Sequence, residues 1–429
     1  MSVLRHRSSV SPRRNLGVGG STINTQLLIA PKQSEGGPAS RALRVALVGC
    51  GKVADQHLEA IHRIPGCEIV ALCDRELLMA KQLGERFGMS ACFSDLAEML
   101  QSTFADVVHI TTPPQSHYSL ARQCLESGCH VYLEKPFTIT AGEAESLIQF
   151  AESCDLKITV GHNYQFTLEM LEMRRLVKEG FLGGRPIHLE SYWSYDLGDL
   201  RYAASFLGDP NHWVRQLPGQ LFHNIISHGI AKLAEFLDDD IRLIVASAHQ
   251  SPQLSHSGAS ELMDELRVLL QDKHGTTAQF CFTTQFRPAL NRLRIYGPRN
   301  SLMADILTGT LIRSPGASYK SYLTYFIPPL KNAREYFRNL RLNVTNFIRQ
   351  RLYQDFGMTE LIKRFYDSIR LDTPVPIPYR EILLTARTMD EIFAQIYPAR
   401  ARADASEQTR KQTADYADLA GLSVEGLKR

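Results

Sequence analysis

The chain has 429 residues, of which 44% are hydrophobic and 22% are charged, and its formal net charge is +3. This length is too great for one ordinary core and predicts two domains with tails. The small net charge gives no reason to expect a nucleic-acid partner. No apolar run approaches the roughly 18 residues needed for a membrane span, so we expect no transmembrane segment.

The two ends of the chain have the composition of tails. The first 40 residues are rich in Ser, Gly, Pro and Arg and contain no acidic residue before Glu35. A segment of this kind cannot bury enough apolar surface to offset its ordering entropy. We therefore expect a disordered basic tail over 1–40 and a polar tail over 401–429.

The cysteines argue against a disulfide framework and against a metal site. Seven of the eight lie between Cys50 and Cys154, and none forms a Cys-x-x-Cys pair or a zinc-type spacing with histidine. Several fall inside expected strands, where cysteine behaves as a small apolar residue. We expect reduced thiols, no bound metal and a cytoplasmic location.

A glycine-rich turn follows the first expected strand. Residues 43–48 form a short apolar run, and Gly-x-Gly-x-x-Ala follows at once. The first glycine allows a tight turn, the second admits a pyrophosphate close to the backbone, and the alanine lets the next helix pack closely. The expected cofactor contacts of this turn are Gly49, Gly51, Lys52, Val53 and Ala54.

An acidic residue lies where a dinucleotide ribose would need it. A second expected strand, over 68–72, leads to Asp74, roughly 20 residues after the glycines. A carboxylate there disfavours a 2′-phosphate, so we predict NAD as the cofactor. The neighbouring Arg75, also a candidate cofactor contact, leaves NADP open.

Strands and helices then alternate as far as residue 161, which predicts a doubly wound parallel sheet. The expected helices cover 77–87, 95–101, 118–127 and 141–154, and the expected strands cover 91–93, 107–111, 129–133 and 156–161. Thr140 and Glu143 have the spacing of a capping box, which predicts that a helix begins at Ala141.

Two turns at the carboxyl edge of this sheet carry polar residues. Thr112, Pro113 and His117 follow one expected strand, and Glu134 and Lys135 follow another. Ligands of open α/β sheets bind at this edge. The proline after Lys135 favours extended geometry there and so aims the lysine. Taken alone, this turn favours a strand end with a solvated lysine, and only the rest of the chain reverses that preference.

The motifs occur in an order typical of one family. They are Gly49-x-Gly51-x-x-Ala54 with His57, Asp74, Thr112-Pro113-Pro114 with His117, Glu134-Lys135-Pro136 and Gly161-His162-Asn163. Over about residues 43–190 the chain resembles the Gfo/Idh/MocA oxidoreductases, named for glucose–fructose oxidoreductase and inositol dehydrogenase. These motifs are specific for the family and not for a substrate.

The resemblance implies an activity. Members transfer hydride between a nicotinamide and a hydroxyl-bearing carbon of a sugar, polyol or nucleotide sugar, and commonly form homo-oligomers. Lys135 would lie beside the nicotinamide and stabilise charge on the reacting oxygen. The further cofactor contacts implied are Thr112, Pro113, His117, Glu134, Lys135 and Asn163.

A different pattern begins after residue 165. A helix over 168–178 precedes strand-like runs over 187–193, 241–248, 263–270, 277–284 and 293–296. The family implies a large, mostly antiparallel open sheet here. We therefore expect a Rossmann domain over 41–165 and an α+β substrate and oligomerisation domain over 166–400.

Residues 218–228 resemble the Gly-Gly…Asp-x-Gly-x-His element of the family. His228 matches the catalytic histidine, a general acid–base near neutral pH. Asn224 occupies the position where many members have aspartate, and Ile226 a glycine position. An amide cannot take a proton, although it can orient a partner by hydrogen bonds. The spacing of four predicts that Asn224 and His228 share one helix face.

Five further residues are candidates for substrate binding, because aromatic faces and charged hydrogen bonds commonly hold sugars. They are Tyr164, His212, Trp213, Arg215 and His223. His223 is also a second candidate for the proton role, although it would point away from His228. His212, Trp213 and Arg215 equally fit packing and surface roles, and Tyr164, near the domain junction, could contact either the cofactor or the substrate.

Residues 316–356 mix aromatic and basic side chains, and Glu335 is nearly the only acidic residue among them. A helix of this composition could lie on an anionic membrane surface or bind a phosphate-bearing substrate. We favour a helical insertion packed on the second domain with a solvated basic face.

Two alternatives to a dehydrogenase stay open on sequence alone. One is a glycoside hydrolase that retains NAD and uses transient oxidation, as some relatives do. The other is a cofactor-binding sensor without catalysis, which Asn224 supports and which Lys135 and His228 oppose.

Overall fold

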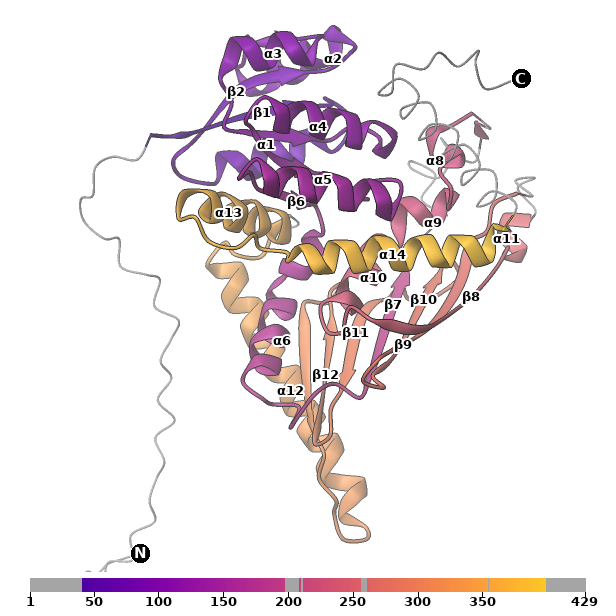
Figure 1. The fold of residues 1–429 in the computed structure, drawn as a ribbon. Helices are drawn as coiled ribbons and strands as arrows, with labels where there is room; N and C mark the ends of the chain where they lie inside the picture. Colours follow the sequence, from indigo (N-terminus) through magenta and orange to yellow (C-terminus); the bar gives the residue numbers. More distant parts are fainter. Residues whose placement is uncertain (1–40, 197–207, 210, 256–260, 354, 399–429) are drawn as a thin grey trace, which may run out of the picture. The chain divides into compact units, whose positions relative to one another are not determined.

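The computed structural model describes residues 41–196, 208–209, 211–255, 261–353 and 355–398. The tails expected over 1–40 and 401–429 lie outside this part of the chain. Two sheets organise the described residues, and helix α14 (Tyr379–Ile396) runs between helix α5 of the first sheet and the strands of the second (Figure 1).

The first sheet is parallel, with strand order β3-β2-β1-β4-β5-β6, as predicted for a doubly wound fold. Its strands are β1 Leu43–Val48, β2 Cys67–Cys73, β3 Cys92–Phe93, β4 Val107–Ile110, β5 His130–Leu133 and β6 Ile158–Val160. Its helices are α1 Ala54–His62, α2 Leu77–Phe87, α3 Leu96–Thr103, α4 His117–Glu126 and α5 Ala141–Ser153. The chain reverses its direction across the sheet between β1 and β4, which places a crevice at their carboxyl ends.

The capping box at the start of α5 is confirmed. The Thr140 hydroxyl accepts the Glu143 backbone N–H at 3.2 Å. The Glu143 carboxylate accepts the N–H of Ile139 at 3.0 Å, one residue earlier than a standard box would use. The cap thus fixes the loop that carries Lys135 to the start of a helix.

The second sheet is mixed, with strand order β13-β12-β11-β7-β10-β9-β8. Its strands are β7 His188–Ser194, β8 Ile241–His249, β9 Glu265–Asp272, β10 Thr277–Thr283, β11 Asn291–Tyr296, β12 Asn300–Asp305 and β13 Thr310–Pro315. The pair β7–β10 is parallel and the other described pairs are antiparallel, which confirms the expected mostly antiparallel sheet. Strands β12 and β13 were not predicted, because few of their residues are typical strand formers.

The other helices after residue 165 lie around the second sheet, except the last of them, which packs beside α1 of the first sheet. They are α6 Leu168–Lys178, α8 Trp213–Gln216, α9 Gln220–Ile225, α10 Ser227–Ala234, α11 Pro252–Ser255, α12 Leu323–Ile348 and α13 Phe356–Arg370. Two single turns, η1 Pro114–Ser116 and η2 Asn163–Phe166, lie in the loops after β4 and β6. A Cβ on Gly229 of α10 would lie 2.2 Å from the Phe280 ring of β10, so this glycine permits the close approach of helix and sheet.

The prediction of one continuous helix through Asn224 and His228 is wrong. The segment divides at Ile226, which ends α9 and precedes α10. Asn224 and His228 therefore lie on separate short helices. Their proximity has to be shown by contacts and does not follow from their spacing of four.

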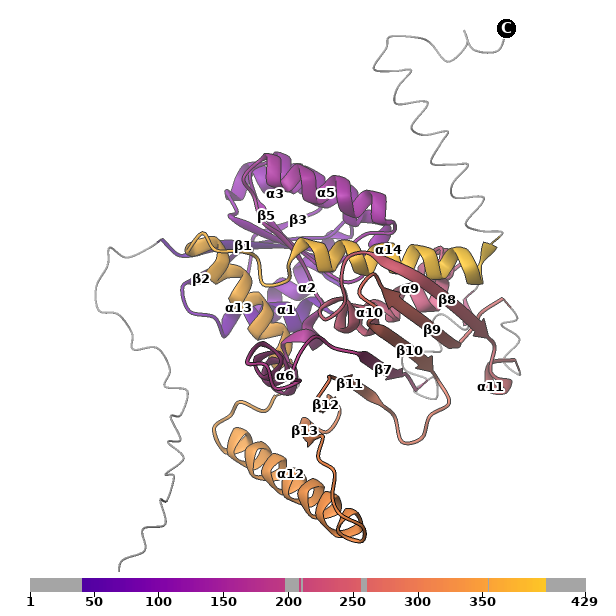
Figure 2. The ribbon, with the colours of Figure 1, turned by 60° about the horizontal axis from the view of Figure 1, so that its bottom comes forward.

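Helix α13 returns from the far end of the chain to the first sheet, beside α1 (Figure 2). Met358, Leu361, Phe365 and Tyr366 are buried in the same core as β1, β4 and β5. This stretch belongs to the range 166–400 that we expected as the second domain. The domain boundaries stay a prediction, but α13 contributes its apolar face to the first core.

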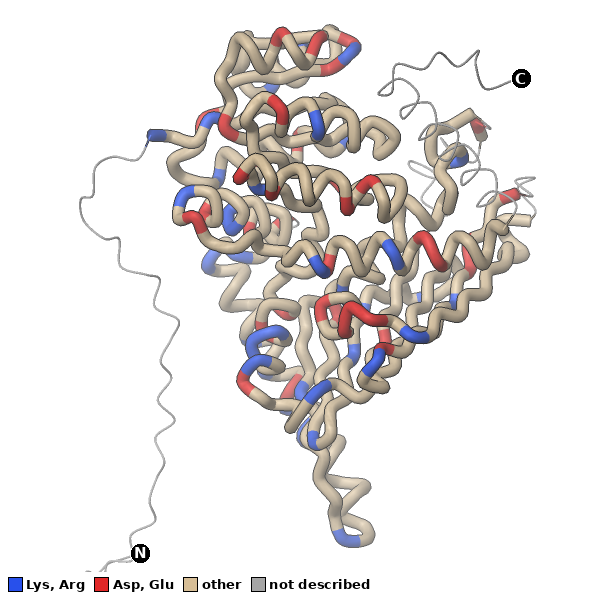
Figure 3. The backbone as a smooth tube through the Cα atoms, viewed as in Figure 1, with Lys and Arg blue, Asp and Glu red and all other residues tan. Residues whose placement is uncertain are grey.

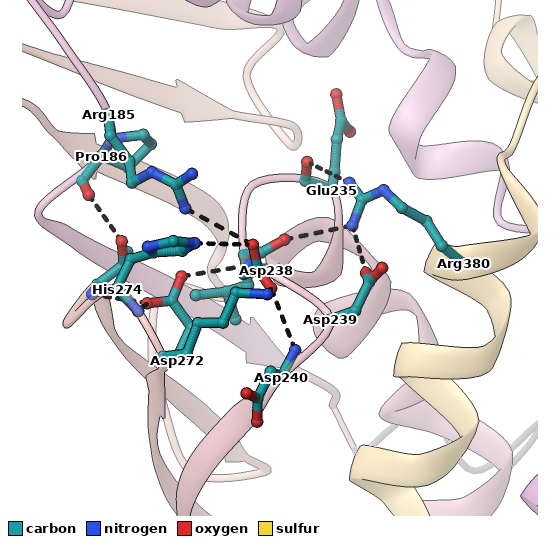
Figure 4. Close-up of polar contacts among 12 residues, drawn as sticks. Arg185, Pro186, Glu235, Asp238, Asp239, Asp240, Asp272, His274 and Arg380 are labelled. Atoms are coloured by element: carbon teal, nitrogen blue, oxygen red, sulfur yellow. Dashed lines mark hydrogen bonds and ion pairs between the residues drawn. The ribbon is translucent and has the colours of Figure 1, made fainter.

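A polar cluster ties α14 to the turns of the second sheet (Figure 4). Asp238 accepts from Lys273 at 2.8 Å and from His274 at 3.2 Å, and the Lys273 hydrogen bond lowers the pKa of Asp238 to about 2. Arg380 of α14 donates to Asp239 at 2.9 Å and to the Leu237 carbonyl at 3.3 Å. These contacts fix one end of α14 against the turn between α10 and β8.

Charge and cysteine patterns follow the composition. Basic and acidic residues are interspersed over both sheets and their helices (Figure 3).

All eight cysteines lie in described residues and are unpaired, as expected. Burial raises the pKa of Cys50 to about 12, which keeps this thiol protonated. Among the described helices, none has both the length and the hydropathy required to cross a bilayer.

The basic aromatic segment is a helix, as predicted, but its apolar residues are not packed on the second domain. Asn339 is the buried residue of α12, and it bonds to the backbone of Leu311 in β13 at 2.9 Å. Figure 2 shows α12 alongside β13, at the edge of the second sheet. The aromatic side chains of α12 lie on its exposed side. The segment thus forms a helical insertion on the second sheet, as we favoured, but it is held there by polar contacts.

Candidate active site

The glycine turn after β1 is built for a close approach of its backbone to a ligand. Gly49 has φ +95°, and a Cβ there would lie 2.7–2.8 Å from atoms of Thr112. A Cβ on Gly51 would meet no atom within 4 Å, so Gly51 faces open space. Helix α1 begins at Ala54, and its N-cap residue Val53 makes no side-chain cap. The Ala54 N–H donates to the Gly51 carbonyl at 3.1 Å. Since no side chain caps the helix, the amides that follow Ala54 are available to a phosphate group.

Asp74 lies against this turn. Its carboxylate accepts the Cys50 N–H at 2.7 Å and the Glu76 N–H at 2.9 Å. The side chain is held at the carboxyl end of β2, next to the glycines, while Lys52 and Arg75 are exposed. A pyrophosphate at Gly51 and a ribose at Asp74 would fit the residues present.

The loops after β4 and β5 are joined by His117. Its ring is fully buried, and it contacts the Thr112 carbonyl at 2.9 Å and the Pro136 carbonyl at 3.0 Å. Both ring nitrogens are therefore used within the protein, and His117 holds the two loops together without a free nitrogen for a cofactor. Pro113, by contrast, is exposed at this edge, and Thr112 accepts the Ser116 hydroxyl at 2.7 Å.

Lys135 links the loop after β5 to helix α9. It follows β5, and its ammonium donates to the Asn224 carbonyl at 3.0 Å and to the Asn224 side-chain oxygen at 3.3 Å. Burial lowers the pKa of Lys135, and the negative charge of Glu134 opposes this effect. The peptide bond between Lys135 and Pro136 is cis. Asn224, which cannot act as a base, thus orients the lysine.

His228 lies next to this pair in an aromatic cluster. Its ring stacks on Trp193 at 5.2 Å, meets the edge of Tyr164 at 4.7 Å and lies 6.0 Å from His162. Burial holds the pKa of His228 well below its usual value, and the positive charge of Lys135 adds to this. The His228 Nδ1 atom is buried and has no partner among the described residues. His228 is therefore a neutral imidazole beside Lys135.

Glu134 is anchored by a buried chain of hydrogen bonds that sequence reasoning did not assign. His57 contacts Glu134 at 3.0 Å and His109 at 2.9 Å, and His109 contacts the Tyr366 hydroxyl at 2.7 Å. Burial alone would raise the pKa of Glu134, but the hydrogen bond and charge of His57 hold it below its usual value. The presence of His109 inside the apolar run of strand β4 was the sequence signal that could have indicated these hydrogen bonds.

A small cavity lies behind the Lys135 loop. It has a volume of about 20 Å³ and is lined by Pro136, His162, His223 and Ser227, among others. Burial lowers the pKa of His162 to about 3 and that of His223 to about 4. His223 stacks on Phe393 of α14 at 4.9 Å.

Of the other predicted site residues, some lie beside His228 or the β4 loop, whereas Arg215 is already paired within the protein. Tyr164 packs against His228, and the side-chain oxygen of the adjacent Asn163 is buried without a partner among the described residues. Trp213 lies beside the β4 loop, because its carbonyl accepts from Gln115 at 3.1 Å, and the His212 ring is 5.6 Å from the Trp213 ring. Arg215 is buried and ion-paired with Glu261, which leaves it less suited to bind a substrate.

The arrangement brings together a donor, an acceptor and a dinucleotide cradle. Lys135 can donate to a substrate oxygen, and the neutral His228 can accept a proton. A nicotinamide cofactor, when bound, supplies the hydride acceptor or donor. The fit rests on Gly51, which faces open space, and on Asp74 beside it.

Comparisons with known proteins agree with this geometry. The sequence model of the "Oxidoreductase family, NAD-binding Rossmann fold" (GFO_IDH_MocA) matches residues 43–162. D-glucoside 3-dehydrogenase of Escherichia coli is 34% identical over 34% of this chain and 41% of its own length. The uncharacterized oxidoreductase YdgJ of E. coli is 30% identical over 64% of this chain and 81% of its own length.

A solved structure has the same fold. The WlbA dehydrogenase from Bordetella pertussis, in complex with NADH and UDP-GlcNAcA, superimposes with a TM-score of 0.66 at 18% identity, covering 85% of this chain and 97% of that one. The chain thus spans about two fifths of the glucoside dehydrogenase and nearly all of the WlbA fold. These relatives do not favour the hydrolase or the sensor.

Proposed function

The chain belongs to the Gfo/Idh/MocA family of oxidoreductases, and we propose that it transfers hydride between NAD and a hydroxyl-bearing carbon of a sugar, polyol or nucleotide sugar. The observation that carries the proposal is the pair of hydrogen bonds from Lys135 to Asn224. These hydrogen bonds hold Lys135, which follows strand β5 of the Rossmann sheet, beside Asn224 and next to His228. The sugar class is supported by the glucoside dehydrogenase among its relatives.

The residues divide the work as follows. Lys135 donates to the reacting oxygen and stabilises negative charge there, and Asn224 keeps its ammonium in place. His228 accepts the hydroxyl proton during oxidation and returns it during reduction. Trp193 and Tyr164 fix the His228 ring by packing on its face and edge. Glu134, held by His57, sets the charge beside Lys135.

Cofactor choice, location and assembly belong to the same proposal. Asp74 at the glycine turn supports NAD over NADP, because its carboxylate would repel a 2′-phosphate. Eight unpaired cysteines support a reducing, cytoplasmic setting. The open second sheet supports a homo-oligomer, as the family resemblance implies.

The test is absorbance at 340 nm on the purified protein, with NAD or NADP and a panel of sugars, polyols and nucleotide sugars. We expect a rise with one substrate class and a preference for NAD. The Lys135→Met variant should lose turnover by about a hundredfold to a thousandfold and still bind NAD.

A matched control is Lys178→Met on the exposed end of α6, which should keep full activity. Full activity in Lys135→Met would remove Lys135 from the active site. A silent panel with tightly retained cofactor and cleavage of a glycoside would overturn the dehydrogenase in favour of the hydrolase.

A further inference from the structure

Helix α12 packs on the protein with its polar side. Glu335 accepts from Arg313 of β13 at 2.8 Å, Asn339 bonds to Leu311, and Asn343 donates to the Thr308 carbonyl at 3.1 Å. These residues recur at steps of four along one face. A surface helix of a globular protein usually buries its apolar face instead. The contacts of α12 reverse that arrangement.

The opposite side of α12 is an exposed apolar strip. Its members recur at steps of three and four residues, and Leu330, Phe337 and Ile348 are 72%, 68% and 73% exposed. We define the strip as Phe326, Leu330, Phe337, Leu340, Val344, Phe347 and Ile348. No described residue of the strip is buried against the second sheet. A strip of this length on a surface helix indicates a docking face.

A basic hollow adjoins the strip where α12 meets β13. It has a volume of about 430 Å³, and Arg313, Arg334, Arg338 and Arg341 line it together with a single carboxylate, Glu335. That carboxylate is already paired with Arg313 and Arg338. Among the described residues, none forms an ion pair with Arg334 or Arg341. The Arg338 Nε atom is buried and lacks a described partner. The hollow is thus suited to an anion.

We propose that α12 docks the protein on an anionic phospholipid surface. The arginines of the hollow bind lipid phosphate, which guanidinium groups recognise by paired hydrogen bonds. The apolar strip enters the boundary between head groups and acyl chains, where Phe and Leu of amphipathic helices reside. The enzyme then works beside a membrane without spanning it. This inference is independent of the proposed hydride transfer.

Charge argues for a lipid surface over a second copy of the chain. The exposed sides of α12 carry Lys331, Arg334 and Arg341, and its one acid, Glu335, faces the protein. Two α12 helices facing each other would bring basic residues together without exposed acids on either helix to offset them. An anionic bilayer attracts the same residues, by an amount that grows with each Lys or Arg near its surface.

The test is flotation of the full-length protein with vesicles of phosphatidylcholine alone and of phosphatidylcholine mixed with phosphatidylglycerol. We expect binding to the mixed vesicles, weakened by high salt, and little binding to the neutral ones. Arg334→Glu with Arg341→Glu should weaken binding about tenfold or more. Phe337→Ser with Phe347→Ser should weaken it similarly, since these side chains supply the inserted area.

The matched control is Leu78→Ser with Lys81→Glu on α2, another exposed helix, which should bind like the unchanged protein. Thermal melts check that each variant folds, and the exposed positions of the four α12 residues predict unchanged melting. Equal binding by all variants, or no binding to anionic vesicles, would overturn the proposal. An oligomer in solution that the Phe337/Phe347 variant dissociates, without vesicle binding, would assign the strip to a second copy.

Discussion

At the scale of single residues, two amines and an imidazole in and near the site are partly or wholly removed from water. Lys135, Lys232 and His228 all have a pKa lowered chiefly by burial. Neighbouring groups add to this effect or oppose it, because a nearby carboxylate favours the charged form of a buried base and a nearby positive charge disfavours it. A substitution beside Lys135 and the removal of Lys232 therefore test these pKa shifts in two ways.

Asn224→Asp tests the role of the amide beside Lys135. A carboxylate at this position favours the ammonium form and raises the pKa of Lys135. If the protonated lysine is the form that donates to the substrate, activity is lost as the pH rises through this pKa. We expect the alkaline limb of the rate profile to move upward by about one pH unit or more.

The control for this test is Asn224→Ala, which removes the side-chain acceptor and adds no charge. Its alkaline limb should not move upward, whereas its rate should fall because Lys135 is less well oriented. An identical pH profile for the unchanged protein and the aspartate variant would show that Lys135 does not titrate in turnover.

Lys232 is a second residue whose charge can be tested, through stability. It is fully buried, donates to Asn291 at 2.6 Å and lies 5.2 Å from the Trp193 ring. Burial lowers its pKa to about 7. The unfolded chain binds this proton up to about pH 10. The unfolded state therefore binds more protons between about pH 7 and 10, and folding stability rises with pH over that window.

Lys232→Met removes the buried charge. We expect a higher free energy of unfolding near pH 6, by a few kcal/mol at about 1.4 kcal/mol per pKa unit. The gain should shrink towards pH 10, where the lost contact with Asn291 prevails. Urea unfolding across this range measures it, with Lys178→Met as the exposed control. A gain independent of pH would contradict a titrating Lys232.

At the scale of elements, buried polar contacts connect segments that are distant in sequence. The chain from Glu134 through His57 and His109 to Tyr366 joins the end of β5, α1, β4 and α13. Apolar packing brings α13 to the sheet, and the Tyr366 hydroxyl adds direction to that packing. Because all its members are buried, a lost partner leaves an unsatisfied group inside the core.

Tyr366→Phe keeps the ring and removes the hydroxyl from His109. We expect a loss of about 1–3 kcal/mol in the free energy of unfolding, because one nitrogen of the buried His109 then lacks its partner. Urea titration followed by circular dichroism measures it. Tyr118→Phe, whose partly exposed hydroxyl contacts Ser146 at 3.2 Å, is the matched control and should cost less. Equal losses in the two variants would show that the burial of the His109–Tyr366 hydrogen bond does not increase its contribution to stability.

At the scale of the whole molecule, what could be predicted depended on whether the signal was local. The first sheet has local signals throughout, such as the Gly49 turn and the Thr140 cap, and its strands and helices agree with expectation. The return of α13 and the exposed face of α12 were not predictable, because both depend on contacts between distant segments. Lys135 and His228 came from matched motifs, whereas His109 carried no motif, and Tyr366 lies in a family-like stretch that gave no hint of its partner.

The return of α13 has a consequence for folding. Met358, Leu361, Phe365 and Tyr366 are buried against the first sheet, yet they lie about 200 residues beyond its last strand. A fragment of residues 41–165 contains all six strands of that sheet and lacks this helix. Its core would expose the apolar surface that α13 covers, and it would leave His109 without Tyr366.

We therefore expect the fragment 41–165 to unfold with weak cooperativity and to bind a hydrophobic dye, although it contains a complete Rossmann sheet. A chain of residues 41–398, which keeps α13 and omits both tails, should unfold cooperatively like the full-length protein. Urea titrations of the three chains measure the difference. Cooperative unfolding of the short fragment would mean that the first sheet is stable without α13. In that case α13 would need the sheet for its own docking, whereas the sheet would not need α13.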